Sequence, residues 1–142
     1  METIKQLSVF LENKYGRLNE ILSILGEHNV SIIAASVADT SEYGILRVIT
    51  SDTEEAYQIL KNSSISANIS EVIAIGCDSL ASAYATELAK LAQESICIEY
   101  MYSFSCKGKA ILIIKISNNE QALVAAAKHN ICTYTQAELD EV

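Results

Sequence analysis

The chain switches between two hydrophobic patterns, one with the period of a strand and one with the period of a helix. From Lys5 to Leu11 apolar side chains occupy alternate positions, which predicts a strand with one buried face. From Leu18 the apolar positions recur at i, i+3, i+4 and i+7, which predicts an amphipathic helix ending within 26–29. The same reasoning predicts strands over 30–38, 45–50 and 69–75, a turn over 39–44, and a short helix over 55–61.

The order of these elements, β-α-β-β-α-β, is that of a ferredoxin-like unit, in which helices cover one face of an antiparallel sheet. The second half of the chain predicts the same order. Its strands are expected over 71–77, 96–105, 110–116 and 131–135, and its helices over 80–94 and 118–128. In the first of these helices Tyr84, Leu88 and Leu91 should face inward, and the polar tail 136–142 should form one short turn or fray.

The two halves form an internal repeat. Ile32 corresponds to Ile98, which defines a constant offset in residue number (98 − 32 = 66), and the same offset relates Leu22 to Leu88 without a gap. A repeat of this size indicates two copies of one supersecondary unit. We therefore expect an α+β protein with one unit over 1–69 and another over 70–142. Because each unit is near the size limit for an independent core, the two should pack side by side.

The short helix of each half follows a serine that has a glutamate three residues later. The pairs are Ser51 with Glu54 and Ser117 with Glu120. In a capping box the serine side chain binds the helix N-terminus and the glutamate reaches back. The pattern predicts that these serines open the two helices.

Composition excludes several classes of function. The chain has 142 residues and a net charge of −8, so nucleic-acid binding is disfavoured, although Tyr100, Tyr102 and Phe104 share one strand face of the kind on which bases stack. No apolar run reaches membrane-spanning length, and no signal peptide begins the sequence. The four cysteines form no metal or redox motif. We expect a cytoplasmic protein with reduced thiols, no metal and no cofactor.

The loop ENKYGRL, residues 12–18, lies between the first strand and the first helix. The helix N-terminus presents unpaired N–H groups, and Gly16 leaves room for a ligand to approach the backbone. Asn13 adds a side chain that both donates and accepts hydrogen bonds. Such a seat suits the carboxylate of a free amino acid better than a polyphosphate, because no phosphate-binding glycine motif is present. The structural alternative is that Asn13 starts a turn and Gly16 relieves backbone strain.

ENKYGRL, followed by HNVSIIAASVADTSEYGILRVIT, resembles the ACT domain. The resemblance rests on Glu12 to Leu18, on Asp39 before the strand that begins Gly44-Ile45-Leu46-Arg47, and on SICIEYMYSF, residues 95–104, in the second half. It implies a tandem, regulatory ACT protein that binds amino acids between its two units and has no catalysis of its own. Tyr15 replaces the usual proline of this loop.

The resemblance implies a ligand site between the first loop and the second strand of the other unit. The equivalent loop of the second half has lost its glycine, so the first loop is the better candidate. The ligand carboxylate would bind backbone N–H groups of residues 16–18. Its ammonium would meet Asn13 and strand carbonyls. The predicted ligand-binding residues are Leu11, Asn13, Tyr15, Gly16, Arg17, Leu18, Cys97, Ile98 and Tyr100.

Two other classes of function remain open. The first is a small hydrolase of acyl phosphates, which shares only the fold and is supported by Arg17 and Asn13 alone. The second is a pure protein-interaction module without a small ligand. The resemblance further implies a homodimer and a regulated protein partner.

Overall fold

The chain forms two compact units in a computed structural model, which describes residues 2–12, 14–39 and 43–141. The first unit runs from Lys5 to Ser70. The second unit comprises the chain from Glu71 onward, together with the described residues that precede Lys5. The domain bounds 1–69 and 70–142 stay a prediction.

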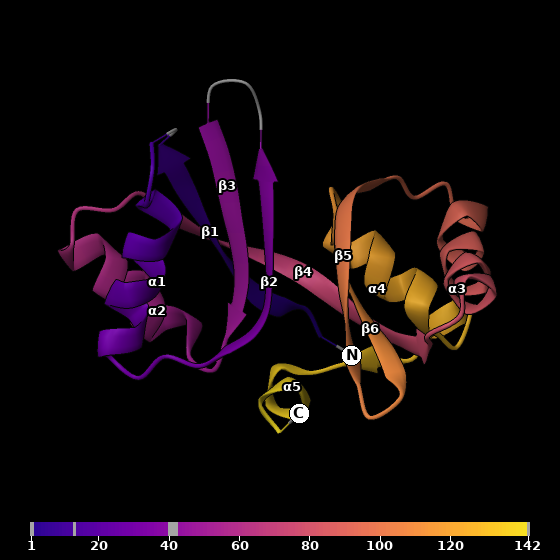
Figure 1. Ribbon diagram of the computed structural model, residues 1–142. Coiled ribbons are helices and arrows are strands. Elements are labelled where there is room, and N and C mark those ends of the chain that lie inside the picture. Colours follow the sequence, from indigo (N-terminus) through magenta and orange to yellow (C-terminus); the bar gives the residue numbers. More distant parts are fainter. Residues whose placement is uncertain (1, 13, 40–42, 142) are drawn as a thin grey trace. The chain divides into compact units, whose positions relative to one another are not determined.

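The first unit has the predicted ferredoxin-like order (Figure 1). Strand β3 pairs antiparallel with β2 on one side and with β1 on the other, and β4 lies next to β1. The helices α1 and α2 lie together on one side of these strands. The elements are β1 (Ile4–Glu12), α1 (Arg17–Glu27), β2 (Ile32–Asp39), β3 (Tyr43–Thr50), α2 (Thr53–Asn62) and β4 (Ala67–Asp78).

The core of the first unit follows from the two hydrophobic periods. Leu7, Val9 and Leu11 alternate along β1 and are buried, as the period of two predicts. They pack in one cluster with Ile21 and Leu25 of α1. The opposite face of β1 carries Ser8 and other polar residues, together with the half-exposed Phe10.

The second unit repeats this arrangement, with the strand order β5-β6-β4-β7. Strand β4 continues into it and takes the place that β1 holds in the first unit. Leu91 of α3 is buried, and Tyr84 and Leu88 pack on the same core, as predicted. The elements after β4 are α3 (Ala81–Gln93), β5 (Ile98–Cys106), β6 (Lys109–Ile116), α4 (Asn119–Lys128), β7 (Thr133–Tyr134) and α5 (Gln136–Asp140).

The internal repeat is present in the backbone in detail. Strands β3 and β6 have equivalent bounds under the repeat offset, and so do the helices α2 and α4. The register irregularity between Ile32 and Ala34 recurs between Ile98 and Tyr100. Non-glycine residues with positive φ also fall at matching positions: Asn29 with Ser95, and Ser64 with Asn130.

The predicted helix caps are wrong by one residue. The side chain of Asp52, not Ser51, accepts a hydrogen bond of 3.0 Å from the N–H of Glu55 at the start of α2. Ser51 is instead tied to the start of β2, because its N–H donates to the carbonyl of Ser31 over 3.0 Å. At α4 the cap is likewise Asn118.

The tail after β7 is ordered and helical. Thr135 and Glu138 form a capping box at the start of α5, and Leu139 is fully buried. The short helical turn expected here is therefore present over Gln136–Asp140. The sequence contained its signal, a threonine followed three residues later by a glutamate.

The described residues hold four free cysteines, of which Cys97 and Cys132 are exposed and Cys77 and Cys106 are partly buried. No cluster of three or more histidine, cysteine, aspartate or glutamate side chains in these residues has the geometry to hold a metal ion. No helix within the described ranges combines the length and apolar character needed to cross a membrane.

Candidate functional site

A pocket of about 160 Å³ opens in the first unit at the start of α1. It lies on the helix-covered side of the sheet, where β1 and β2 end and β3 begins. Its lining combines an apolar floor with charged residues of both signs. The lining residues are Leu11, Glu12, Lys14, Arg17, Leu18, Val37, Asp39 and Gly44.

Two glycines shape the backbone around this pocket. Gly16 is the N-cap of α1 and has a φ of 77°, a left-handed conformation that favours glycine. No side chain of the described residues caps this helix, so its first turn keeps N–H groups that a ligand can use. A Cβ on Gly44 would lie 3.3 Å from the carbonyl oxygen of Ala38 and 3.5 Å from Leu11, so this glycine allows close strand pairing beneath the pocket.

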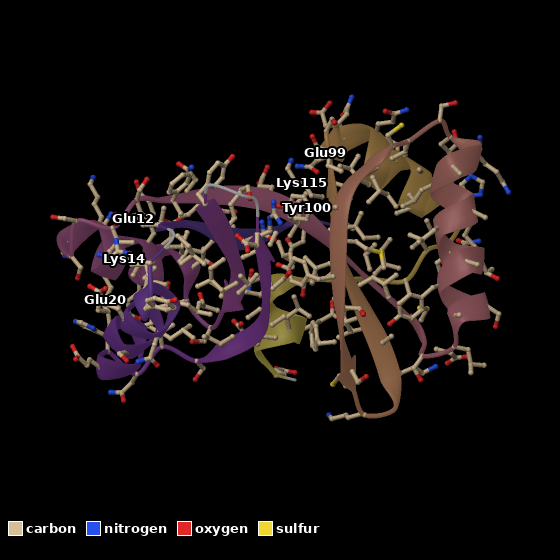
Figure 2. All side chains as sticks on the ribbon, turned by 45° about the horizontal axis from the view of Figure 1, so that its top comes forward. Glu12, Lys14, Glu20, Glu99, Tyr100 and Lys115 are labelled. Carbon is tan, nitrogen blue, oxygen red and sulfur yellow. The ribbon has the colours of Figure 1, made fainter. Side chains whose placement is uncertain are left out.

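Arg17 supplies the most buried charge of the pocket. Its side chain is 13% exposed, and its guanidinium lies 3.2 Å from a carboxylate oxygen of Glu20 and 3.8 Å from one of Glu12. Its Nε is buried and has no hydrogen-bond partner among the described residues. Figure 2 shows Glu12, Lys14 and Glu20 grouped around the start of α1. A guanidinium held in this way keeps donor capacity for a carboxylate.

The floor of the pocket is apolar and partly open. Leu11 is buried in the core of the first unit, and Leu18 packs against that core from α1. Val37 of β2 is 51% exposed, although it lies on the same face as the buried Leu46. The pocket therefore offers apolar contact below and charged groups above, the combination typical of sites for small polar metabolites.

The architecture and this site can be compared with known proteins. A family model described as an ACT domain pair matches residues 2–141. The chain belongs to the ACT domain pair family. No curated protein gives a significant match.

Solved structures show the same fold. Protein BT0572 from Bacteroides thetaiotaomicron is 35% identical, with a TM-score of 0.93 over 99% of this chain and 98% of that one. The regulatory subunit of aspartate kinase from Thermus thermophilus, in its ligand-free form, is 15% identical, with a TM-score of 0.62 over 89% of this chain and 91% of that one. The corresponding subunit from Thermus flavus is 17% identical, with a TM-score of 0.60 over 90% and 92%. At these identities the two kinase subunits show the fold alone.

The ACT pair brings together part of the predicted site. Leu11, Arg17 and Leu18 line the pocket of the first unit. Tyr15 and Gly16 are exposed and do not line it. Asn13 lies outside the described residues.

The predicted residues of the second ACT unit lie at the start of β5. Cys97 is exposed and precedes the strand, and Ile98 packs on the core of that unit. Tyr100 pairs in register with Lys115, whose ammonium lies 3.9 Å from Glu99 (Figure 2). Their part in a ligand site stays a prediction.

Sequence reasoning missed five lining residues. Glu12, Asp39 and Gly44 stood in the stretches that resemble the ACT domain but were not assigned to the site. Val37 belongs to the apolar strand predicted over 30–38, and nothing in that pattern marked it as exposed. Lys14 stood in the first of these stretches as well and was likewise not assigned to the site.

In the second ACT unit a side chain occupies the corresponding place. Tyr84 and Ser103 are the repeat equivalents of Leu18 and Val37, and the phenol of Tyr84 donates a hydrogen bond of 3.1 Å to the Ser103 hydroxyl. The helix α3 also begins two residues earlier in the repeat than α1, so Ser82, the equivalent of Gly16, lies inside it. The absence of this glycine from the second half thus accompanies a connecting loop that is two residues shorter.

Proposed function

We propose that this ACT pair is a regulatory module that binds a free α-amino acid at the pocket of its first unit and catalyses no reaction. The observation that carries the proposal is the pocket at the start of α1, which combines the largely buried cation Arg17 with an apolar floor. The regulatory role is supported by the family and by its kinship in fold to proteins described as regulatory subunits of aspartate kinase.

The charges around the pocket suit a zwitterion. The ligand carboxylate would bind the guanidinium of Arg17 and the N–H groups of the first turn of α1, where the helix dipole favours an anion. The ammonium would face the carboxylates of Glu12 or Asp39, both of which line the pocket. The ligand side chain would lie against Leu18 and Val37. We also propose that the bound amino acid contacts Asn13, Cys97, Ile98 and Tyr100.

The test is a thermal-shift screen against the twenty amino acids, followed by calorimetry of any ligand that raises the melting temperature. A ligand at about 100 times its Kd should add roughly 2.7 kcal/mol to the free energy of unfolding. The Arg17→Met variant should weaken binding at least about tenfold, because the carboxylate loses its charged partner. The amide derivative of the same amino acid, which has no carboxylate, should bind weakly to the unmodified protein.

The matched control is Lys5→Met, which also removes an ion-paired cation from the first unit. Lys5 binds Glu54 over 2.8 Å and does not line the pocket, so its loss should leave affinity unchanged. A flat screen, or unchanged affinity in Arg17→Met, would reject this site. Release of inorganic phosphate from an added acyl phosphate would favour the hydrolase alternative. We also propose that the chain pairs with a second copy of itself and acts on a regulated enzyme. Light scattering with and without the ligand would test both associations.

A further inference from the structure

A second pocket lies in the second ACT unit on the face of the sheet opposite α3 and α4. Its volume is about 330 Å³, about twice that of the pocket in the first unit. Ile111 forms part of its wall, and the residues on either side of it in β6, Ala110 and Leu112, belong to the helix-covered core. The lining residues are Cys106, Lys107, Lys109, Ile111, Tyr134, Glu138 and Glu141.

The first unit has only a small counterpart of this pocket. There a cavity of about 90 Å³ is lined by residues that include Phe10, Ile45 and Asn68, whose repeat equivalents are Gly76, Ile111 and Tyr134. The ring of Phe10 stacks on Tyr43 with 4.6 Å between ring centroids, so the first unit fills this place with its own aromatic pair. In the second unit the residue at that position is glycine.

The walls of the larger pocket are fixed by packing. The ring of Tyr134 lies so close over Gly76 that a Cβ there would overlap it. The fully buried Leu139 and the capping box hold α5 in place. Burial raises the pKa of the Tyr134 phenol, so it stays protonated at neutral pH and can donate a hydrogen bond into the pocket.

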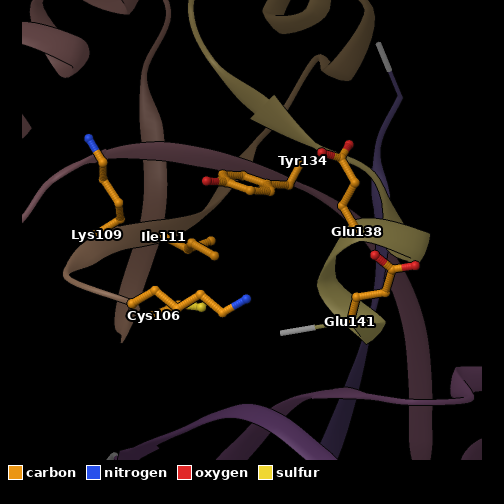
Figure 3. A pocket seen from close by; sticks show the side chains of 7 residues that line it. Cys106, Lys109, Ile111, Tyr134, Glu138 and Glu141 are labelled. Carbon is orange, nitrogen blue, oxygen red and sulfur yellow. The ribbon is translucent and has the colours of Figure 1, made fainter.

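The charges of the pocket come from two separate elements. Lys107 lies in the turn between β5 and β6, and Lys109 begins β6, whereas the glutamates come from α5 and the residue after it. Figure 3 shows Lys109 on the hairpin side and Glu138 and Glu141 on the α5 side, with the Tyr134 ring between them. A neutral lining with cations on one wall and anions on the other complements a ligand that carries both charges at its two ends.

Two of these four charges already have partners. The ammonium of Lys109 lies 2.7 Å from a carboxylate oxygen of Asp78. A carboxylate oxygen of Glu138 accepts a hydrogen bond of 3.1 Å from the N–H of Thr135 in the capping box. Among the described residues Lys107 and Glu141 form no ion pair, with each other or with a third residue.

We propose that this pocket binds a small zwitterion whose ammonium and carboxylate are separated by several bonds, such as an ω-amino acid or a dipeptide. Lys107 binds the carboxylate, Glu141 binds the ammonium, and the apolar stem lies on Ile111. A spherical cavity of this volume is roughly 8 to 9 Å across, so an α-amino acid with an uncharged side chain, whose ammonium and carboxylate flank the same carbon atom, does not reach both walls. The site is distinct from the pocket of the first unit and takes a ligand of different length.

The experiment is a two-dimensional amide NMR titration of the full chain with 6-aminohexanoate. We expect saturable shifts at the amides of residues 106–111 and 134–141. Hexanoate and hexylamine, which each lack one charge, should bind at least about fivefold more weakly. The variants Lys107→Asn and Glu141→Gln should each weaken binding by a similar factor. Asparagine is chosen because Lys107 has a φ of 51°, a conformation that asparagine tolerates.

The matched control is Lys61→Asn in α2. It removes a lysine of the first unit that does not line this pocket, so it should not change the titration. Shifts that do not saturate, equal binding of hexanoate or hexylamine, or unchanged binding in both variants would each overturn the proposal. The amides of residues 14–18 report the first pocket separately. The failure of one site therefore does not imply the failure of the other.

Discussion

The phenol of Tyr84 donates a hydrogen bond of 3.1 Å to the hydroxyl of Ser103, and this pair stands where the first unit has Leu18 and Val37. In the first unit these two residues line a pocket. In the second, the longer side chain reaches across to the strand. The same position in the repeat is therefore open in one copy and bridged in the other.

This relationship predicts that the hydrogen bond between tyrosine and serine can be reproduced in the first unit by two substitutions. The double variant Leu18→Tyr, Val37→Ser should close the pocket of the first unit, because the phenol can reach the new hydroxyl as in the second unit. Amino-acid binding, measured by calorimetry, should be lost, while the melting temperature without ligand stays within a few degrees. The single variant Val37→Ser is the control and should keep the pocket open. Undiminished binding in the double variant would contradict the assignment of the pocket.

Gly76 is predicted to be intolerant of even one added methyl group. A Cβ there would meet the Tyr134 ring and lie 3.0 Å from its hydroxyl oxygen. Overpacking of this kind typically costs about 1–3 kcal/mol, so Gly76→Ala should lower the free energy of unfolding in urea by that amount. Adding Tyr134→Leu should recover part of the loss, which a double-mutant cycle would detect as coupling.

The control for this substitution is Gly26→Ala in α1. A Cβ at Gly26 meets nothing within 4 Å, and alanine is a better helix former than glycine. This variant should gain roughly 0.5–1 kcal/mol in the free energy of unfolding. If Gly76→Ala were as stable as the parent chain, the Tyr134 ring would not lie over this glycine.

Much of the fold could be predicted because it depends on periodicity and repetition. The apolar alternation of β1 and the i, i+4 pattern of α1 each indicate one buried face, and burial is what orders these elements. The constant offset between the halves transferred these assignments to the second half. It held even for a strand irregularity and for the left-handed residues Asn29 and Ser95, which periodicity alone does not reveal.

The site was harder to predict, because it depends on where elements end. Arg17 and Leu18 were found from the loop motif. Val37 was not, since the apolar pattern of its strand predicts burial, whereas the structure leaves it 51% exposed. The bridge from Tyr84 to Ser103 was also missed: Tyr84 was correctly expected to face inward, but the sequence does not say which strand residue its hydroxyl reaches.

The helix caps give a prediction that separates two sequence interpretations. Before α2 and before α4, two neighbouring residues could each serve as the N-cap: a serine, and the aspartate or asparagine that follows it. The position of the first helical residue decides which of the two is the cap. Asp52→Ala and Asn118→Ala should each cost about 1 kcal/mol in urea unfolding, because each side chain accepts a backbone N–H bond of 3.0 Å. Ser117→Ala should change stability by less than about 0.5 kcal/mol. A larger loss in Ser117→Ala than in Asn118→Ala would restore the serine as the cap.

The last prediction concerns acid stability and rests on Glu94, at the C-terminal end of α3. Its carboxylate lies 2.8 Å from the ammonium of Lys128 and 2.8 Å from Nε2 of His129. Hydrogen bonds from Lys128, and then from His129, lower the pKa of Glu94 in the folded state. The unfolded chain therefore holds the proton up to a higher pH than the folded one, and stability rises with pH through that window.

The contribution of Glu94 should be complete above the ordinary glutamate pKa of about 4.3 and should disappear as the pH falls through the lowered value. Glu94→Gln should accordingly be less stable than the parent chain near neutral pH, with a gap that closes in acid. Urea unfolding at a series of pH values from about 2.5 to 7 measures this gap. Glu2→Gln, which alters an exposed residue without such partners among the described residues, should show no comparable closing. A gap for Glu94→Gln that stays constant over the whole range would mean that Lys128 and His129 do not favour the charged carboxylate.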